Sequence, residues 1–143
     1  MKHPLMLSTI FAASALSAAH ELDGRDLDRG ENLYGEHCAA CHGANLEGQP
    51  DWKTPDENGV LPAPPHDKTG HTWHHDNDLL FQYTKFGGQE ALAKRGIVGF
   101  KSGMPGLAEA LSDEDIWDVL AYIRSTWPKR VQDIQKMRNP PHR

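Results

Sequence analysis

The clearest hydrophobic pattern in the chain predicts a helix that begins directly after Ser112. Ser112 and Asp115 have the spacing of a capping box, in which each side chain binds the backbone N–H group of the other residue. Apolar residues then recur every three or four positions, as they do on one face of a helix: Ile116, Val119, Leu120 and Ile123. Tyr122 lies beside this face, and Pro128 predicts that the helix ends before it.

A second helical pattern covers residues 27–40, behind a polar lead-in over residues 21–29. Its positions at spacings of three and four are Leu27, Gly30, Leu33, Tyr34 and His37. Glycine inside a helix costs about 1 kcal/mol relative to alanine. We therefore expect Gly30 to mark a place where another helix approaches closely, with Tyr122 of the last helix as its partner.

Two weaker patterns predict shorter helices. Residues 76–86 have an apolar face, and either Asp76 or Asp78 is suited to cap the N-terminus. That face is formed by Leu79, Leu80, Tyr83 and Phe86. In the tail, residues 129–143, a spacing of three predicts a short amphipathic helix that packs through Val131, Ile134 and Met137.

Residues 43–65 and 87–106 show no periodicity and are rich in glycine and proline, so both are predicted to be loops. Loops of this length without structure of their own are uncommon in a compact domain. A bound cofactor would give the first of them a surface to wrap around.

The composition agrees with a small domain that contains such a cofactor. The chain has 143 residues, only 38% of which are hydrophobic, and a formal charge of −5 that argues against a nucleic-acid partner. Residues 1–19 have a basic start, a short apolar run and small residues before position 20, as in a signal peptide cleaved after Ala19. No later stretch is apolar enough to span a membrane.

The strongest motif is Cys38-Ala39-Ala40-Cys41-His42, the C-x-x-C-H sequence at which haem is attached covalently. Two thiols at this spacing can bond to the two vinyl groups of one porphyrin, and the histidine that follows can bind the iron. A zinc site would require further ligand pairs, but the chain has only two cysteines. A disulfide oxidoreductase motif would follow a strand in a βαβ pattern, and no such pattern is present.

The second ligand of the iron is predicted to be Met104. It lies in a loop bounded by glycine and proline, just before the capped helix, and glycine permits a close approach of the backbone. Met137 has helical spacing and is predicted to pack instead, whereas Met6 lies in the signal segment. A thioether ligand opposite histidine raises the reduction potential relative to two histidines.

These features together resemble the class I cytochromes c of bacterial periplasms. The resemblance covers residues 27–127 and rests on C-x-x-C-H-G at 38–43, a proline-bearing loop, Gly103-Met104-Pro105-Gly106 and the final helix up to Tyr122. It implies an all-α, small cytochrome c fold, with N- and C-terminal helices crossing at Gly30 and Tyr122 and long loops wrapped round one haem. It also implies that a backbone carbonyl within residues 62–65 accepts the Nδ1 proton of His42.

A cluster of histidines follows the proline-bearing loop: His66, His71, His74 and His75. They could form a copper or zinc site or lie near a haem propionate, to which Trp73 could also donate. They have no regular ligand spacing and no cysteine to assist them, so we expect no second metal. The segment 70–78 is similar to a subgroup of exported monohaem cytochromes.

The predicted protein is a periplasmic, monomeric electron carrier that is not an enzyme and exchanges electrons with redox protein partners. Residues 1–19 would be the signal peptide, and residues 20–143 the monohaem domain, with a core over 27–127 and an extension over 128–143. One alternative is a haem protein whose methionine bond is weak and which binds or transforms a small molecule. The other is a dedicated cytochrome subunit of a larger oxidoreductase complex, for which the C-terminal extension is the support.

Overall fold

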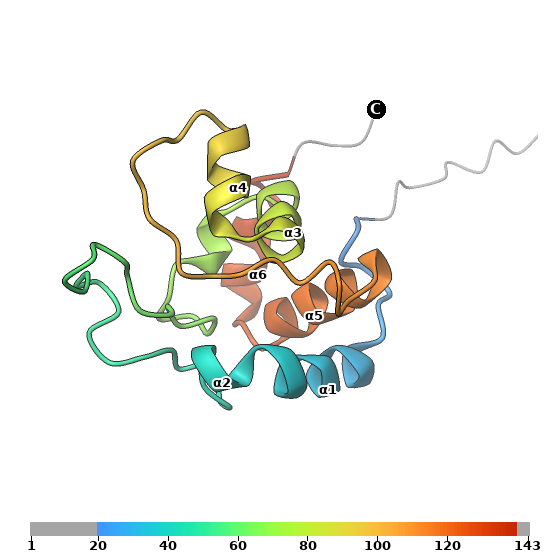
Figure 1. The fold of residues 1–143 in the computed structure, drawn as a ribbon. Coiled ribbons are helices and arrows are strands. Elements are labelled where there is room, and N and C mark those ends of the chain that lie inside the picture. Colours follow the sequence, from blue (N-terminus) through green and yellow to red (C-terminus); the bar gives the residue numbers. More distant parts are fainter. Residues whose placement is uncertain (1–19, 140–143) are drawn as a thin grey trace, which may run out of the picture.

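The structure, a computed structural model, describes residues 20–139. This part of the chain is helical, with no strand and only two isolated bridges, Val60–Lys101 and Gly87–Pro105. The predicted all-α class is therefore confirmed. Figure 1 shows the 3₁₀ helix η1 (Thr72–His74) and the helices α1 (Leu27–His37), α2 (Ala39–His42), α3 (Asn77–Phe86), α4 (Gly88–Lys94), α5 (Asp113–Ser125) and α6 (Lys129–Lys136).

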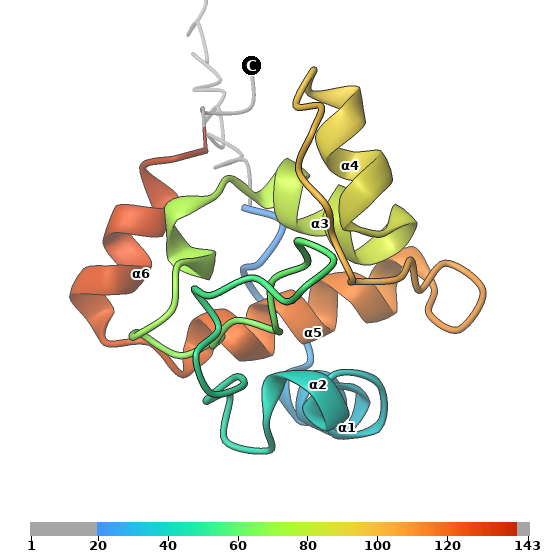
Figure 2. The same ribbon diagram turned by 60° about the vertical axis from the view of Figure 1, so that its left-hand side comes forward.

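Helices α1 and α5 make the most extensive contact between helices of the described chain and cross steeply, with α1 seen almost end-on in Figure 2 while α5 runs across the view. The crossing lies at Gly30, as predicted. A Cβ atom at this position would lie 2.2 Å from the carbonyl oxygen of Asp118 and 2.9 Å from Cβ of Tyr122. Only glycine lets the two backbones approach this closely.

Helix α5 has the predicted start and buried face. The Ser112 hydroxyl accepts from the N–H of Asp115, and the Asp115 carboxylate accepts from the N–H of Ser112, which completes the capping box. Each of the four residues predicted for its apolar face is at most 5% exposed. The helix ends at Ser125, before Pro128, and Trp127 is buried just beyond it.

The N-terminal prediction is corrected at both ends. Helix α1 stops at His37 because φ of Cys38 opens to −119°, although its N–H still bonds to the Tyr34 carbonyl. The separate turn α2 follows where one continuous helix to residue 40 was expected. At the other end, the Asp26 carboxylate accepts from the N–H of Arg29 and caps α1. The predicted loose lead-in is partly packed, since Leu22 is buried in the core with Leu120.

Residues 87–106 are not a loop throughout, because their first part forms α4. The prediction gave weight to the glycines, but the residues between them include strong helix formers, Gln-Glu-Ala-Leu-Ala-Lys at 89–94. Helix α4 packs against α3, and its Ala91 is buried. Residues 95–104 then run on without regular structure.

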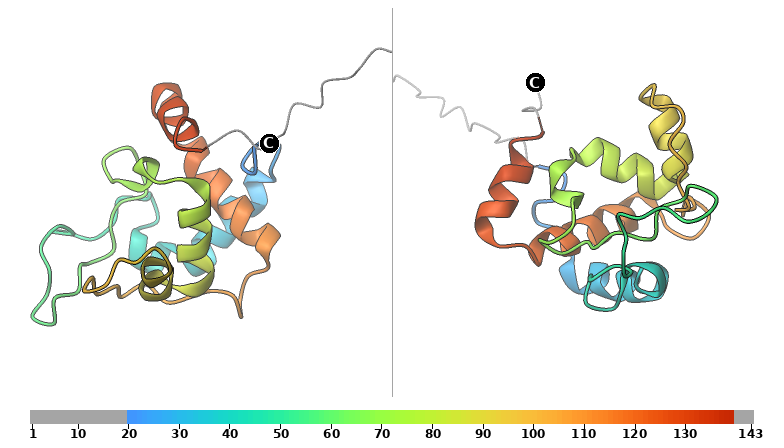
Figure 3. Two further views of the ribbon diagram at one scale, coloured as in Figure 1. Left: turned by 90° about the horizontal axis from the view of Figure 1, so that it is seen from above. Right: turned by 90° about the vertical axis from the view of Figure 1, so that its left-hand side faces the viewer.

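The tail forms the helix α6, as predicted, and Val131 packs against the core cluster that contains Trp127, but the rest of the inward face differs from the prediction. The residue with no exposed surface is Gln135, and Met137, which was expected to pack, is 78% exposed. Helix α6 packs against η1, and the two lie side by side in Figure 3. Hydrogen bonds from Gln135 to the carbonyl of His75 and to the side chain of Asn77 support this contact.

The two long segments, residues 43–71 and 95–104, spread out on the same side of the helices (Figures 1 and 3). They are joined to one another at the Val60–Lys101 bridge, where the Lys101 ammonium also donates to the carbonyl of Asn58 at 2.8 Å. This link connects the segment that follows His42 with the segment that leads to Met104.

Candidate haem site

The two cysteines and His42 lie together on the turn α2, at the end of α1. The N–H of Cys38 binds the carbonyl of Tyr34, and its own carbonyl accepts from Cys41 and His42, so the motif is folded as one turn. Both thiols are free; Cys38 is buried and Cys41 exposed. Burial raises the pKa of the Cys38 thiol to about 11.

His42 is buried, and its ring is fixed by a backbone carbonyl. Its Nδ1–H donates to the carbonyl oxygen of Pro64 at 2.8 Å. The expected acceptor within residues 62–65 is therefore present, and the structure identifies it as Pro64. Burial lowers the pKa of His42 while the bond to Pro64 acts in the opposite direction, which favours the neutral imidazole that a metal requires. The remaining ring nitrogen is Nε2.

Met104 is held in place through its backbone. Its carbonyl accepts from the N–H of Gly88 at 3.1 Å, and its N–H donates to the Ser102 hydroxyl, which is also bonded to Tyr83. A Cβ atom on Gly88 would lie 2.0 Å from the Ser102 oxygen, so the loop fits against the start of α4 only because that residue is glycine. The Met104 side chain is half-buried.

These residues fit a covalently attached haem. Two unbonded thiols three positions apart precede a neutral imidazole whose Nδ1 is already occupied, which leaves Nε2 for iron. Cys38, Cys41 and His42 share one turn, whereas Met104 comes from a second segment joined to the first at Val60. The thioether adds the soft donor that class I sites use.

The four histidines of residues 66–75 make different ring contacts, although the rings of His71 and His75 meet edge to face at 5.3 Å. His66 stacks on the ring of His42, whereas His71 stacks on Trp52 and His74 packs on Trp73. Burial lowers the pKa of His66, of His71 and of His75. The indole N–H of Trp73 donates to the carbonyl of Lys68 at 3.2 Å. Within residues 20–139 there is no group of three or more histidine, cysteine or acidic side chains suited to a metal ion.

A buried polar cluster joins the two ends of the described chain and was not predicted. The amide of Asn77 donates to the His20 ring and to the Glu21 carboxylate, and its oxygen accepts from Gln135 Nε2 at 2.7 Å. Gln135 Nε2 also donates to the carbonyl of His75. The burial of Gln135 could not be predicted from the sequence, because it depends on tertiary partners and Gln135 resembles the other polar residues of the tail.

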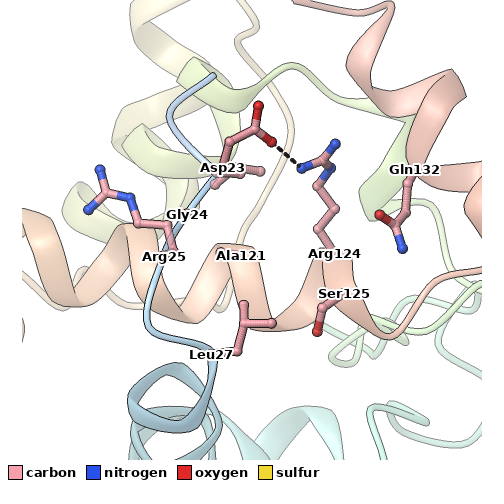
Figure 4. A pocket seen from close by; sticks show the side chains of 9 residues that line it. Asp23, Gly24, Arg25, Leu27, Ala121, Arg124, Ser125 and Gln132 are labelled. Atoms are coloured by element: carbon pink, nitrogen blue, oxygen red, sulfur yellow. Dashed lines mark hydrogen bonds and ion pairs between the residues drawn. The ribbon is translucent and has the colours of Figure 1, made fainter. Parts of the chain in front are cut away.

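A groove of about 310 Å³ lies between the lead-in, α5 and α6, away from the cysteines and Met104. Figure 4 shows the ion pair of Asp23 and Arg124 at its upper end, with N–O separation 3.2 Å. Leu27 and Ser125 line its lower part, and Arg25 points away from it. The groove adds nothing to the haem site.

Comparison with known proteins agrees with this geometry. The family model described as Cytochrome c matches residues 27–127, which is most of the chain. The chain belongs to the cytochrome c family. This cytochrome is also 28% identical over 120 residues to a protein named cytochrome c6 from Porphyra purpurea, an alignment that covers 84% of the chain and 89% of that relative. No solved structure gives a significant match.

Membership of the family settles the cofactor and the general activity. Proteins of the cytochrome c family bind haem c covalently, so the predicted cofactor, one covalent haem c, is confirmed. The cytochrome is accordingly a haem c electron-transfer protein. None of the helices over residues 20–139 is long and apolar enough to cross a membrane.

Proposed function

We propose that the protein is an exported electron carrier of the bacterial periplasm, with haem attached at Cys38 and Cys41 and bound axially by His42 and Met104. The observation that carries this proposal is the buried His42 ring, which follows two free thiols and donates Nδ1–H to Pro64. When bound, the haem iron supplies the redox couple, by cycling between Fe(III) and Fe(II).

The protein tunes that couple through its two axial residues. The hydrogen bond to Pro64 makes the His42 imidazole a more basic ligand and fixes which nitrogen is free. The thioether of Met104 favours the ferrous state, because soft sulfur stabilises the softer ion. With both positions filled there is no open site for a substrate, which supports a carrier rather than an enzyme.

Partner proteins would meet the carrier where the attachment turn reaches the surface. Cys41 is exposed although Cys38 and His42 are buried, so one edge of the attached group would lie close to solvent. Small, transient interfaces suit such exchange, and we propose a monomer that meets its redox partners in this way. Residues 1–19 would be removed on export, leaving residues 20–143 as the working domain.

A redox titration combined with a carbon monoxide test examines the proposal. The purified protein should undergo reversible one-electron reduction, elute as a monomer and, when ferrous, resist carbon monoxide. Rapid formation of a carbon monoxide complex by the wild type would instead support a site with a weak methionine bond. Elution only in a stable complex with other proteins would support a dedicated subunit.

A further inference from the structure

His66 is placed face to face with the proposed axial histidine. The ring centroids of His42 and His66 are 3.9 Å apart, with an angle of 24° between the ring planes, so the two imidazoles are in van der Waals contact over their faces. Ring contacts of the neighbouring histidines are different: His71 lies against Trp52 and His74 against Trp73. The stack is thus specific to position 66.

The side chain of His66 is itself fixed. Its Nδ1 hydrogen-bonds with the hydroxyl of Thr72 at 2.8 Å, and Thr72 is only 5% exposed. The ring of Tyr34 also meets the His66 ring in an edge-to-face arrangement, with centroids 6.4 Å apart and planes at 74°. A ring held at its edge and its side cannot rotate freely, so it presents a constant face to His42.

The backbone of His66 is anchored to two further parts of the fold. Its N–H donates to the carbonyl of Leu46 at 2.8 Å, and its carbonyl accepts from the indole N–H of Trp127 at 2.7 Å. Both partners are buried, at 5% and 3% exposure. The position of the ring is therefore determined by the segment after α2 and by the end of α5 together.

The stretch from Pro64 to His66 holds the imidazole of His42 in two directions. The Pro64 carbonyl binds its Nδ1 edge, and the His66 ring covers its face. A single hydrogen bond leaves a ring free to swing about that bond, whereas a second contact over the face removes this freedom. The orientation of an axial imidazole matters electronically, because its π orbital overlaps with one direction of the iron d orbitals.

We infer that His66 is a positioning residue, whose ring face fixes the rotation of His42 about its bond to the haem iron. This inference rests on the proposed role of His42 as an axial ligand. The effect would be to fix which iron d orbital holds the unpaired electron in the ferric protein. It would thereby also help to set the distribution of spin over the porphyrin edge through which electrons leave.

The test compares two substitutions in the full-length holoprotein. His66→Leu fills the space without a flat face, whereas His66→Phe keeps a ring. The readout is the spread of the haem methyl proton resonances in the NMR spectrum of the ferric protein, with the reduction potential measured alongside. We expect His66→Leu to change the spread and His66→Phe to restore a pattern close to wild type. His71→Leu, which removes an exposed histidine of the same segment, is the control and should leave the spread unchanged.

A second variant covers the case in which His66→Leu does not accumulate. Thr72→Val leaves both rings but removes the bond that holds His66, and should change the spread in the same direction by a smaller amount. Spectra of His66→Leu and Thr72→Val that match the His71→Leu control would contradict the inference while His42 remained the ligand. A wild-type spectrum without histidine ligation would contradict the proposed function, and the inference with it.

Discussion

His42 is held by groups that touch its ring, whereas Met104 is held through its backbone. On the histidine side, the Pro64 carbonyl and the His66 ring contact the imidazole directly. On the methionine side, Gly88 and Ser102 bind only the main chain, and the side chain is half-buried. Contacts to its side chain therefore fix the orientation of His42, while the position of the Met104 thioether depends on the backbone of its loop.

Because of this difference, we expect mutations on the two sides of the haem site to have different effects. Changes on the His42 side should disturb attachment and the order of the ring, because several buried contacts depend on one another there. Changes to the Met104 side chain should leave the fold and the attachment in place and alter what the iron can bind and its reduction potential.

The largest effect should come from removing both thiols. Cys38→Ser combined with Cys41→Ser should abolish covalent attachment, because no other cysteine exists in the chain. The measurement is the mass of the denatured protein after extraction with acidic acetone, which should include one haem in the wild type and none in the variant. A wild-type mass equal to the bare chain would contradict the attachment site.

Met104→Ala should keep the haem but open the second axial position. Ferrous protein should then bind carbon monoxide quickly, and the reduction potential should fall, because the soft ligand that favours Fe(II) is lost. Met137→Ala is the matched control, since Met137 is 78% exposed and lies outside the site. Equal behaviour of the two variants in stopped-flow binding would show that Met104 is not the ligand.

Gly30→Ala should destabilise the fold by about 1–3 kcal/mol through overpacking, because the new Cβ would lie 2.2 Å from the Asp118 carbonyl. Gly35→Ala is a control in the same helix, where an added Cβ would meet nothing within 4 Å. It should stabilise by about 0.5–1 kcal/mol. Chemical denaturation of the two variants would reveal the opposite signs, and equal changes would mean that the crossing does not limit position 30.

Gln135→Ala should lower the free energy of unfolding by about 1 kcal/mol, because two hydrogen bonds are lost while an unpaired buried oxygen is also removed. Helix α6 packs on η1, which contains Thr72, so the loss should reach the His42 side only. Denaturation followed by haem absorbance would measure it, with exposed Met137→Ala as reference. If Gln135→Ala also lost the methionine ligand, the idea that the His42 and Met104 sides respond independently would be contradicted.

The smallest effect should be on the pH dependence of stability, through the Asp115 carboxylate. Hydrogen bonds from Ser112 and Arg29 lower the pKa of Asp115 from 3.8 to about 2. A carboxylate with a lowered pKa stabilises the fold above about pH 4, and that contribution is lost as the pH falls towards 2. Asp115→Asn should therefore lose less stability across this window than the wild type. Exposed Asp51→Asn is the charge control, and an unchanged pH profile in Asp115→Asn would count against the prediction.

The sequence was most informative where structure is determined by near neighbours. The capping box at Ser112, the buried face of α5 and the C-x-x-C-H turn each depend on residues a few positions apart, and all are present. The close crossing at Gly30 was also predicted, because Gly30 falls on the helical spacing of Leu27, Leu33 and Tyr34. Gly35 of the same helix is off that spacing, and a Cβ there would meet nothing within 4 Å.

Features that depend on distant partners could not be predicted in the same way. Helix α4 was not predicted, because glycines at its start indicate a loop although strong helix formers follow them. The prediction for the inward face of α6 was right for Val131 and wrong for Met137, and it missed Gln135, which is buried by its bonds to Asn77 and His75 rather than by its hydropathy. His66 was one of four similar histidines, and only the stack on His42 distinguishes it.

Binding of the iron by both His42 and Met104 can be read from the near-infrared spectrum of the ferric protein. A thioether bound to ferric haem gives a sulfur-to-iron charge-transfer band. We expect this band in the wild type and in Met137→Ala, and its loss in Met104→Ala with the haem still attached. A wild-type spectrum without the band, or a band that survives unchanged in Met104→Ala, would contradict this expectation.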